Sequence, residues 1–454
     1  SSWRNLRGDL MFKTLANAFR IKEIRNKILF TLAMLVVIRI GSILPIPGVN
    51  TDYFTNLFNT TATGDQFSFV NALTGGSLLK MSVFALSITP YITSSIIMQL
   101  LTIAIPKLEE LQKDGEDGRK KIATITRYVT IALSLIEGIA MVIGFGRQGL
   151  ISNYSSMTTF HKIFSGVMMV SILTAGSALL MWIGERITEN GVGNGISIVL
   201  LVNIISSIPE DMVVLFEQFV KPQSIAKGVL AAAIILAILV ALVAFICFLQ
   251  DGERRIEVRY ANKINGAGKL PYQGGRTTNI PLKVNTAGVM PIIFASSLMQ
   301  FPVILVQLFS TKQHEWTRYL SSSYWCRTSD WKYSIGLLVY LILIVVFAYF
   351  YTSITFNPLE IANNLRRQSG VIPGINPGKP TSDYLNRVLN YIVLIGAVFL
   401  MVVALVPILC SGLFNASVSF GGTSIIIIVG VVLETAKQIE SMMAKRYYKG
   451  FLSD

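Results

Sequence analysis

The sequence predicts an all-α polytopic membrane protein that crosses the bilayer ten times. Of its 454 residues, 52% are hydrophobic and only 14% are charged, whereas about 25% of residues in a soluble globular domain are charged. Ten separate segments are apolar over roughly the 20 residues that a membrane-crossing helix needs. The basic residues are distributed unevenly between the segments that connect them. Together these observations define the fold class.

The span boundaries follow from charged and helix-breaking residues. Residues 388–433 contain no Asp, Glu, Lys or Arg, and this stretch is too long for one crossing. Breaking residues divide it into two helices and a turn: Pro407, Ser411-Gly412, Asn415 and Gly421-Gly422. The ten spans are predicted near residues 28–45, 81–105, 122–145, 163–184, 192–208, 228–250, 285–309, 333–356, 388–409 and 421–440.

The distribution of Lys and Arg assigns the two sides of the membrane. Of the 39 basic residues, 29 fall on one side of the spans, nine fall on the other, and Arg39 lies inside the first span. Cytoplasmic connectors collect basic residues because positively charged loops resist translocation. Ten crossings then place both termini in the cytoplasm.

Ten spans divide into two sets of five. Because five is odd, sequential halves have opposite orientations, which suits an inverted repeat with a pathway between the halves. The predicted parts are a basic N-terminal segment (1–27), an N-terminal half (28–208), an external connector (209–227), a C-terminal half (228–440) and a cytoplasmic tail (441–454).

The net charge of +14 has two compatible interpretations. Basic residues near a bilayer are attracted to anionic lipids by about 1 kcal/mol each, and they also form a docking surface for acidic partners or RNA. No catalytic constellation accompanies them, since HExxH, Walker A and GxGxxG motifs are absent from the sequence, and no cofactor or metal is expected. The GVGNG segment at 191–195 is interpreted as a helix start that allows close packing.

The segment Met81–Leu101 is unusual for a lipid-facing helix. Pro90 removes a backbone donor inside the predicted span, and small hydroxyl residues flank it, which permits close contact between helices. Three isoleucines spaced four residues apart form one apolar stripe: Ile88, Ile92 and Ile96. The simplest interpretation is a proline-kinked packing helix. The preceding residues 48–80 form either an external loop or a re-entrant segment, which only protein or a cavity can surround.

Two long basic connectors lie on the predicted cytoplasmic side. Residues 251–283 contain seven basic and three acidic residues, and the alternation of Ile256, Val258 and Tyr260 predicts a strand in a hairpin-like loop. Residues 357–387 are predicted to begin with a short helix at 360–368, followed by a stiff protrusion rich in Gly and Pro.

Six stretches, spread in order over nearly the whole chain, resemble the SecY family of bacterial Sec translocon pore subunits. They are RIGSILPIPGV (39–49), ITPYITSSIIMQLL (88–101), GERITENGVGNGISI (184–198), PLKVNTAGVMPIIFASS (281–297), NPLEIANNLRRQSGVIPGINPGKPT (357–381) and GGTSIIIIVGVVLET (421–435). Each is weakly specific alone, but the set is highly specific. The resemblance implies two inverted five-helix halves around a central hourglass pore in the bacterial plasma membrane.

The resemblance also assigns roles to the apolar stripe and to the segment before it. It implies a pore ring of branched side chains at Ile88, Ile92, Val192, Ile196, Ile293 and Ile427. Such a ring dewets readily and hinders ions. Residues 65–77 match the plug that closes the outer funnel, with Phe67, Phe69, Val70, Leu73, Gly75 and Gly76 as its residues.

The second and seventh spans resemble the two sides of the family's lateral gate, with the third and eighth spans in support. The polar cluster of that gate matches Thr93, Glu137 and Gln300. The basic loops match docking sites for the SecA ATPase and the ribosome, at Arg254, Arg255, Arg366, Arg367, Asn376 and Lys379. The family usually has Arg in the turn that here reads PGINPG, so Asn376 removes one charge from this surface.

The predicted function is a passive protein-conducting channel that translocates unfolded secretory chains and releases apolar segments into lipid. The resemblance implies SecE, SecG, SecA, the ribosome, signal-peptide-bearing preproteins and anionic lipids as partners. The alternative is an ion-coupled secondary transporter with an inverted-repeat fold, which needs acidic or carbonyl sites at mid-membrane. An intramembrane protease ranks last, because the spans lack a paired Asp or Ser/His pattern.

Overall fold

The computed structural model describes residues 19, 21–51, 74–145, 158–217, 225–260, 277–309, 315–321, 324–326, 331–414 and 423–449. Each predicted span overlaps one helix of this described chain. The helices are α2 (Lys22–Ile43), α5 (Thr89–Ala104), α7 (Glu116–Phe145), α8 (Thr159–Asn190), α9 (Gly195–Leu215), α10 (Ile225–Asp251), α11 (Met290–Phe309), α13 (Ile335–Thr355), α15 (Lys379–Phe414) and α16 (Thr423–Lys449).

The described residues contain five helical segments that are long and apolar enough to cross a membrane. A sixth is added if α5 and the short helix α6 (Pro106–Lys113), which meet at 105°, form one bent span. Apolar parts of α9, α10 and α11 are shorter than this criterion requires. The chain is therefore a polytopic helical membrane protein, and the count of ten crossings stays a prediction.

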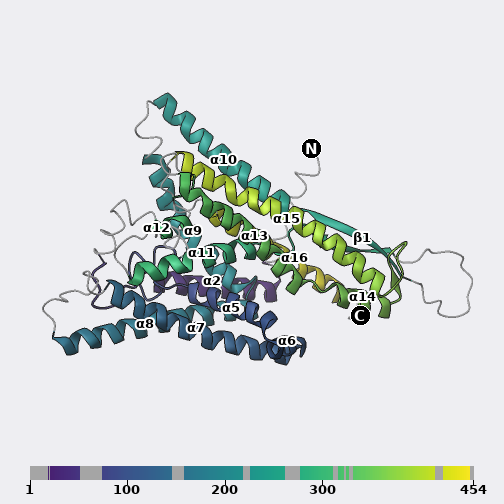
Figure 1. The fold of residues 1–454 in the computed structure, drawn as a ribbon, viewed down its shortest axis with the longest axis horizontal. Coiled ribbons are helices and arrows are strands. Elements are labelled where there is room, and N and C mark those ends of the chain that lie inside the picture. The colour runs from purple at the N-terminus through teal and green to yellow at the C-terminus, as the bar shows by residue number, and fades with distance from the viewer. Residues whose placement is uncertain are drawn as a thin grey trace, which may run out of the picture.

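The helices pack as two sets that meet along two seams. Figure 1 shows α7 and α8 along one long edge of the molecule, and α10 and α15 along the opposite edge. In the N-terminal set α5 packs on α7, and in the C-terminal set α11 packs on α13. The sets contact each other where α11 meets α5 and α7, and again where α9 meets α16.

Helix α5 does not have the predicted proline kink. Pro90 lies in the first turn of the helix, where its missing N–H would have no helical partner and its fixed φ angle suits helix initiation. Residues 81–88 form turns instead, with Met81 and Ser87 at positive φ. The Ile46 amide donates to the Met81 carbonyl oxygen at 2.9 Å and anchors these turns to the end of α2.

Two helices extend past the predicted ends of their spans. Helix α15 has 36 residues and continues through Pro407 to Phe414, so Pro407 does not end it; the break before α16 falls at 415–422, outside the described residues. Helix α9 continues through Pro209 to Leu215, so the expected external connector 209–227 is partly helical. Proline is tolerated inside membrane helices where neighbouring groups satisfy the freed backbone.

The two basic connectors fold into one unit. Strand β1 (Glu253–Tyr260) pairs antiparallel with β2 (Thr277–Lys283) and with β3 (Gly370–Val371). Helix α14 (Pro358–Arg367) confirms the predicted short helix, and β1 confirms the predicted strand. The unit lies at one end of the molecule, beside the first turns of α15 (Figure 1). Its core contains Ile256, Val258, Leu282, Leu365, Ile372 and Leu385.

Two smaller helical elements complete the described chain. Helix α12 (Glu315–Leu320) and the short 3₁₀ helix η5 (Trp331–Ser334) pack against each other and against α13. They close the connection between α11 and α13.

Candidate functional site

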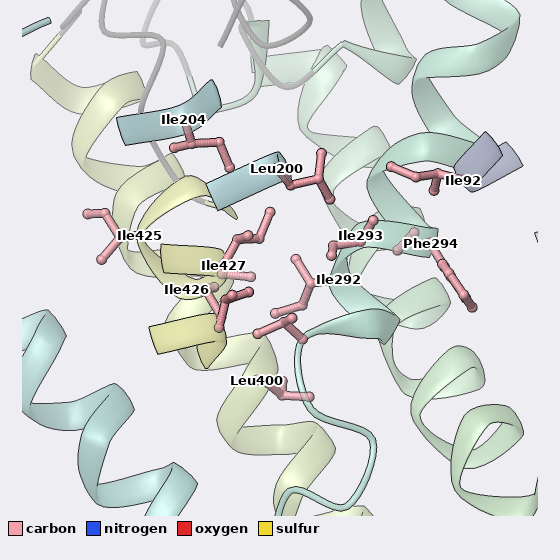
Figure 2. Close-up of a cluster of buried hydrophobic side chains, with 14 of the residues drawn as sticks. Ile92, Leu200, Ile204, Ile292, Ile293, Phe294, Leu400, Ile425, Ile426 and Ile427 are labelled. Carbon is pink, nitrogen blue, oxygen red and sulfur yellow. The ribbon is translucent and has the colours of Figure 1, made fainter. Parts of the chain in front are cut away.

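Branched apolar side chains from both halves meet in one buried cluster. Ile88 and Ile92 of the N-terminal half lie in it with Ile293 and Ile427 of the C-terminal half, all four at most 6% exposed, and Ile196 packs against it. We call these five residues the apolar waist. Figure 2 shows Leu200, Ile292, Ile293 and Ile427 directed toward a common centre, with Ile92 on the far side of Ile293.

The two halves contribute to the waist from matching positions. Helix α5 begins Thr89-Pro90, and α11 begins Met290-Pro291, so proline is the second residue of each helix. In α5 the Ile92 amide donates to the Ile88 carbonyl oxygen at 3.1 Å, and in α11 the Ile293 amide donates to that of Val289 at 3.2 Å. The first turns of α5 and α11, each with the residue just before it, therefore lie in the buried cluster at matching positions.

Val192 is the predicted ring residue that the structure does not bring to the waist. It is buried in a separate cluster with Ile24 of α2 and Ile439 of α16. Its amide donates to the Thr31 hydroxyl at 3.1 Å, which holds the preceding turn against α2. Helix α9 begins three residues later at Gly195, so Val192 precedes the helix and cannot share the face that Ile196 presents.

Sequence reasoning missed other residues of the buried cluster that contains the apolar waist. Leu200, Ile204, Val289, Ile292 and Ile426 belong to the same buried cluster. The four-residue spacing of Ile196, Leu200 and Ile204 was visible in the sequence and repeats the stripe in α5. In contrast, Ile425, Ile426 and Ile427 are all at most 7% exposed. Because they are consecutive and all apolar, the sequence pattern does not indicate which of them faces the waist.

Of the three predicted gate residues, two are buried where their helices meet, and the third forms a hydrogen bond within its own helix. Glu137 of α7 and Gln300 of α11 are each 7% exposed, and their helices pack against each other. Thr93 instead uses its hydroxyl within α5, donating to the Thr89 carbonyl oxygen at 3.1 Å. Within the described chain, Gln300 Oε1 has no hydrogen-bond partner. The α7–α11 contact thus contains buried polar groups without strong cross-links.

The predicted plug is only partly visible. Phe67, Phe69, Val70 and Leu73 lie outside the described residues. Gly75 and Gly76 both have positive φ, 63° and 79°, which only glycine adopts without strain. Gly75 lies against α9, because a Cβ built on it would be 2.9 Å from the Asn203 Cα atom and 2.8 Å from Ser206 Oγ.

The predicted docking arginines on β1 lie on opposite faces of the strand. Side chains alternate along a strand, and Ile256 and Val258 are the buried ones, so Arg254 shares their side and Arg255 points the other way. Arg255 Nε donates to Glu253 Oε1 at 2.8 Å, which offsets part of its charge. Within the described residues Arg254 forms no ion pair.

The other predicted docking residues lie exposed on the same unit. They are Arg366, Arg367, Asn376 and Lys379. The Asn376 carbonyl oxygen accepts a hydrogen bond from the Thr381 hydroxyl at 2.8 Å, so the backbone of the PGINPG turn is fixed while the side chain faces outward. The turn therefore exposes the side chain at position 376 to solvent.

Two sets of apolar helices that share one buried core define a polytopic helical membrane protein. The SecY family matches residues 82–436. The SecY protein translocase subunit of Streptomyces scabiei is 42% identical over 97% of this chain and 100% of its own length, and that of Bacillus subtilis is 41% identical over 98% and 100%. The chain belongs to the SecY family. It is the protein-conducting channel subunit of a protein translocase and not an enzyme.

Solved structures support the same fold. One described as a protein-conducting channel has a TM-score of 0.65 at 17% identity, covering 92% of both chains. One that concerns the SecY plug domain and the closed channel scores 0.62 at 16% identity, again covering 92% of both chains. Sec61 in the canine ribosome–channel complex scores 0.60 at 17% identity with the same coverage.

Proposed function

We propose that unfolded secretory polypeptides pass through the apolar waist, between the two halves, and that apolar segments leave sideways between α5 and α11. The observation that carries this proposal is that isoleucines from both halves share one buried cluster. They reach it from corresponding first turns of α5 and α11. A path between inverted halves is the arrangement that such repeats produce.

Branched apolar side chains suit a constriction that must both seal and widen. In the resting state they pack together and exclude water, so ions meet a dewetted barrier. They have no side-chain hydrogen bonds to break, and a passing chain displaces them by changing packing alone. A ring of charged or amide side chains would instead hold ions and water at the same place.

Sideways release follows from the nature of the seam between α5–α7 and α11. Its buried polar groups, Glu137 and Gln300, weaken it relative to a fully apolar interface. Leu, Ile, Phe or Val each favour the bilayer by about 0.3–0.6 kcal/mol at a helix centre, whereas Arg, Lys or Asp cost about 2.5–3.5 kcal/mol. An apolar segment of about 20 residues therefore partitions into lipid, and a polar chain continues through the waist.

The basic unit formed by β1, β2, β3 and α14 is proposed as the docking surface for SecA and the ribosome. Its exposed arginines suit rRNA phosphate, which accepts bidentate hydrogen bonds from guanidinium groups. The similarity to Sec61 in a ribosome complex supports the ribosome as a partner. SecE and SecG as small membrane subunits, anionic lipids, and a bacterial plasma-membrane location with cytoplasmic termini complete the proposal.

Reconstituted translocation tests the proposal. The chain is inserted with SecE and SecG into proteoliposomes, and SecA, ATP and a signal-peptide-bearing precursor are added outside. We expect precursor that becomes resistant to external protease only when ATP is present. Accessible precursor despite active SecA would overturn the channel function.

A second candidate, ion-coupled solute transport, is favoured only by the burial of Glu137 in α7. Uptake of a small solute by the same proteoliposomes, driven by an ion gradient without SecA, would support it.

A further inference from the structure

Arg39 lies inside the first predicted span, and the assignment of sides does not explain it. It lies four residues before the end of α2 and is half-buried. An ionisable residue within a membrane span is costly and commonly functional. A long side chain near a helix end can extend to the membrane surface, but the Arg39 guanidinium turns instead toward α9 and toward the turn at the C-terminal end of the predicted plug.

Both hydrogen-bond acceptors of Arg39 belong to other segments. Its Nη1 atom donates to Ser206 Oγ at 2.9 Å and to the Gly75 carbonyl oxygen at 3.4 Å. Ser206 Oγ itself lies 3.5 Å from that carbonyl oxygen. The three groups therefore join α2, α9 and the Gly75 turn at one point, which we call the Arg39 clasp (Arg39, Gly75 and Ser206).

The chain around the clasp permits little movement. Gly75 approaches α9 too closely for any side chain. Asn203, one turn before Ser206, donates from Nδ2 to Ser87 Oγ at 3.1 Å. The Ser177 hydroxyl of α8 donates to the Ser87 carbonyl oxygen at 3.3 Å. Together with the backbone bridge between Pro45 and Ser82, these bonds fix residues 75–88 at several points.

We propose that Arg39 is a positioning residue that holds the C-terminal end of the predicted plug against the N-terminal half. The inference rests on the proposed channel function and extends it by naming the group that fixes this end. A single charged donor, 2.9 Å from the Ser206 hydroxyl and 3.4 Å from the Gly75 carbonyl oxygen, links the turn to α9, and hydrogen bonds from charged donors are stronger than neutral ones. Both of these acceptors are neutral, and the part of the chain that the structure describes shows no ion pair at Arg39.

Hydrogen exchange tests the clasp directly in the full complex in lipid nanodiscs. Arg39→Gln removes the charge, and Ser206→Ala removes one acceptor without altering the charge. We expect amide exchange across residues 77–82 to accelerate by roughly tenfold or more in Arg39→Gln, as loss of a charge-assisted bond implies, and by less in Ser206→Ala. The double variant should match Arg39→Gln, because the clasp acts as a unit.

Arg39→Lys should recover most of the protection, since an ammonium group can donate to the same oxygens. Arg186→Gln is the control: Arg186 pairs with Glu189 on the surface of α8 at 2.9 Å, and its loss should leave exchange at 77–82 unchanged. As a second readout, proteoliposomes with Arg39→Gln should leak ions several-fold faster than wild type.

The outcomes separate the two proposals. Exchange and leak at wild-type levels in both Arg39→Gln and Ser206→Ala would overturn the clasp, even if precursor translocation is normal. If wild-type protein fails to translocate precursor, the channel proposal fails. Accelerated exchange in the Arg39 and Ser206 variants would still establish the clasp as the element that fixes this turn.

Discussion

The Ser94 hydroxyl of α5 donates a hydrogen bond of 2.8 Å to the backbone carbonyl oxygen of Thr126 in α7. Ser94 is fully buried, and the bond joins two helices on the same side of the proposed gate. Between these helices and α11, the described residues show packing and buried polar groups, with no corresponding hydrogen bond between the helices. If the proposed gate opens, we therefore expect α5 and α7 to move together while α11 separates from them.

Ser94→Ala should loosen the α5–α7 pair. It leaves the Thr126 carbonyl without this donor, and a buried hydrogen bond contributes about 0.5–1.5 kcal/mol, with membrane helices near the lower end. A fall in unfolding temperature in detergent measures the loss. Ser171→Ala is the matched control, because Ser171 is exposed and bonds only within α8. Equal stability of the two variants would contradict the role given to Ser94.

Gln300→Leu should tighten the seam. Replacing a buried, unsatisfied amide by an apolar group of similar size is neutral or stabilising. We therefore expect an unchanged or raised unfolding temperature and a several-fold lower release of a marginally apolar test segment into lipid, measured by carbonate-resistant membrane integration. Thr93→Val serves as control, since the Thr93 hydroxyl is satisfied within α5. Unchanged release in Gln300→Leu would show that this amide does not weaken the seam.

Gly195→Ala should destabilise the protein at the start of α9. A Cβ at this position would overlap the Gly184 carbonyl oxygen of α8, and overpacking of this kind costs about 1–3 kcal/mol. Gly166→Ala in α8 is the control, because its Cβ would sit 3.5 Å from Val142 Cγ1 at ordinary contact distance. Thermal unfolding of both variants in detergent measures the difference, and equal stability would refute the close packing.

Arg254→Ala should weaken ribosome binding more than Arg255→Ala. Arg255 is partly neutralised by Glu253, whereas Arg254 has no acidic partner among the described residues. Removing an arginine that binds one rRNA phosphate should reduce the slope of log affinity against log salt by about 1. Ribosome binding to proteoliposomes over a series of salt concentrations gives both slopes. A larger effect at Arg255 would reverse the assignment.

Much of the fold followed from composition and spacing. Hydropathy located a helix in each predicted span, and alternation in Ile256 and Val258 located β1. Pro90 was predicted to kink a helix, but it lies in the first turn of α5. Pro407 was predicted to end a helix, but α15 continues through it. A proline stays inside a helix where neighbouring groups bond the backbone carbonyl that it leaves without a donor. Local sequence patterns do not show whether such neighbours are present.

The site was predicted less completely. The four-residue spacing in the sequence singled out Ile88 and Ile92, whereas Ile196, Ile293 and Ile427 were predicted from the resemblance to the SecY family; all five lie in or against the same buried cluster. Val192 does not, because the start of α9 at Gly195 is set by contacts with α8 and by the Asn194 side chain, which accepts from the Ile196 amide at 3.2 Å. The link between Arg39 and Gly75 joins residues 36 positions apart, and local patterns do not reveal such contacts.

Cross-linking of a stalled precursor is the most direct test of the waist. Single cysteines replace Ile92, Ile196 or Ile293 in a background where Cys247, Cys326 and Cys410 are changed to Ser, and Val36, 58% exposed on α2, is the outward-facing control. Adducts at waist positions of both halves, with none at Val36, are expected. Absence of adducts at all three waist positions, or equal labelling of Val36, would contradict passage between the halves.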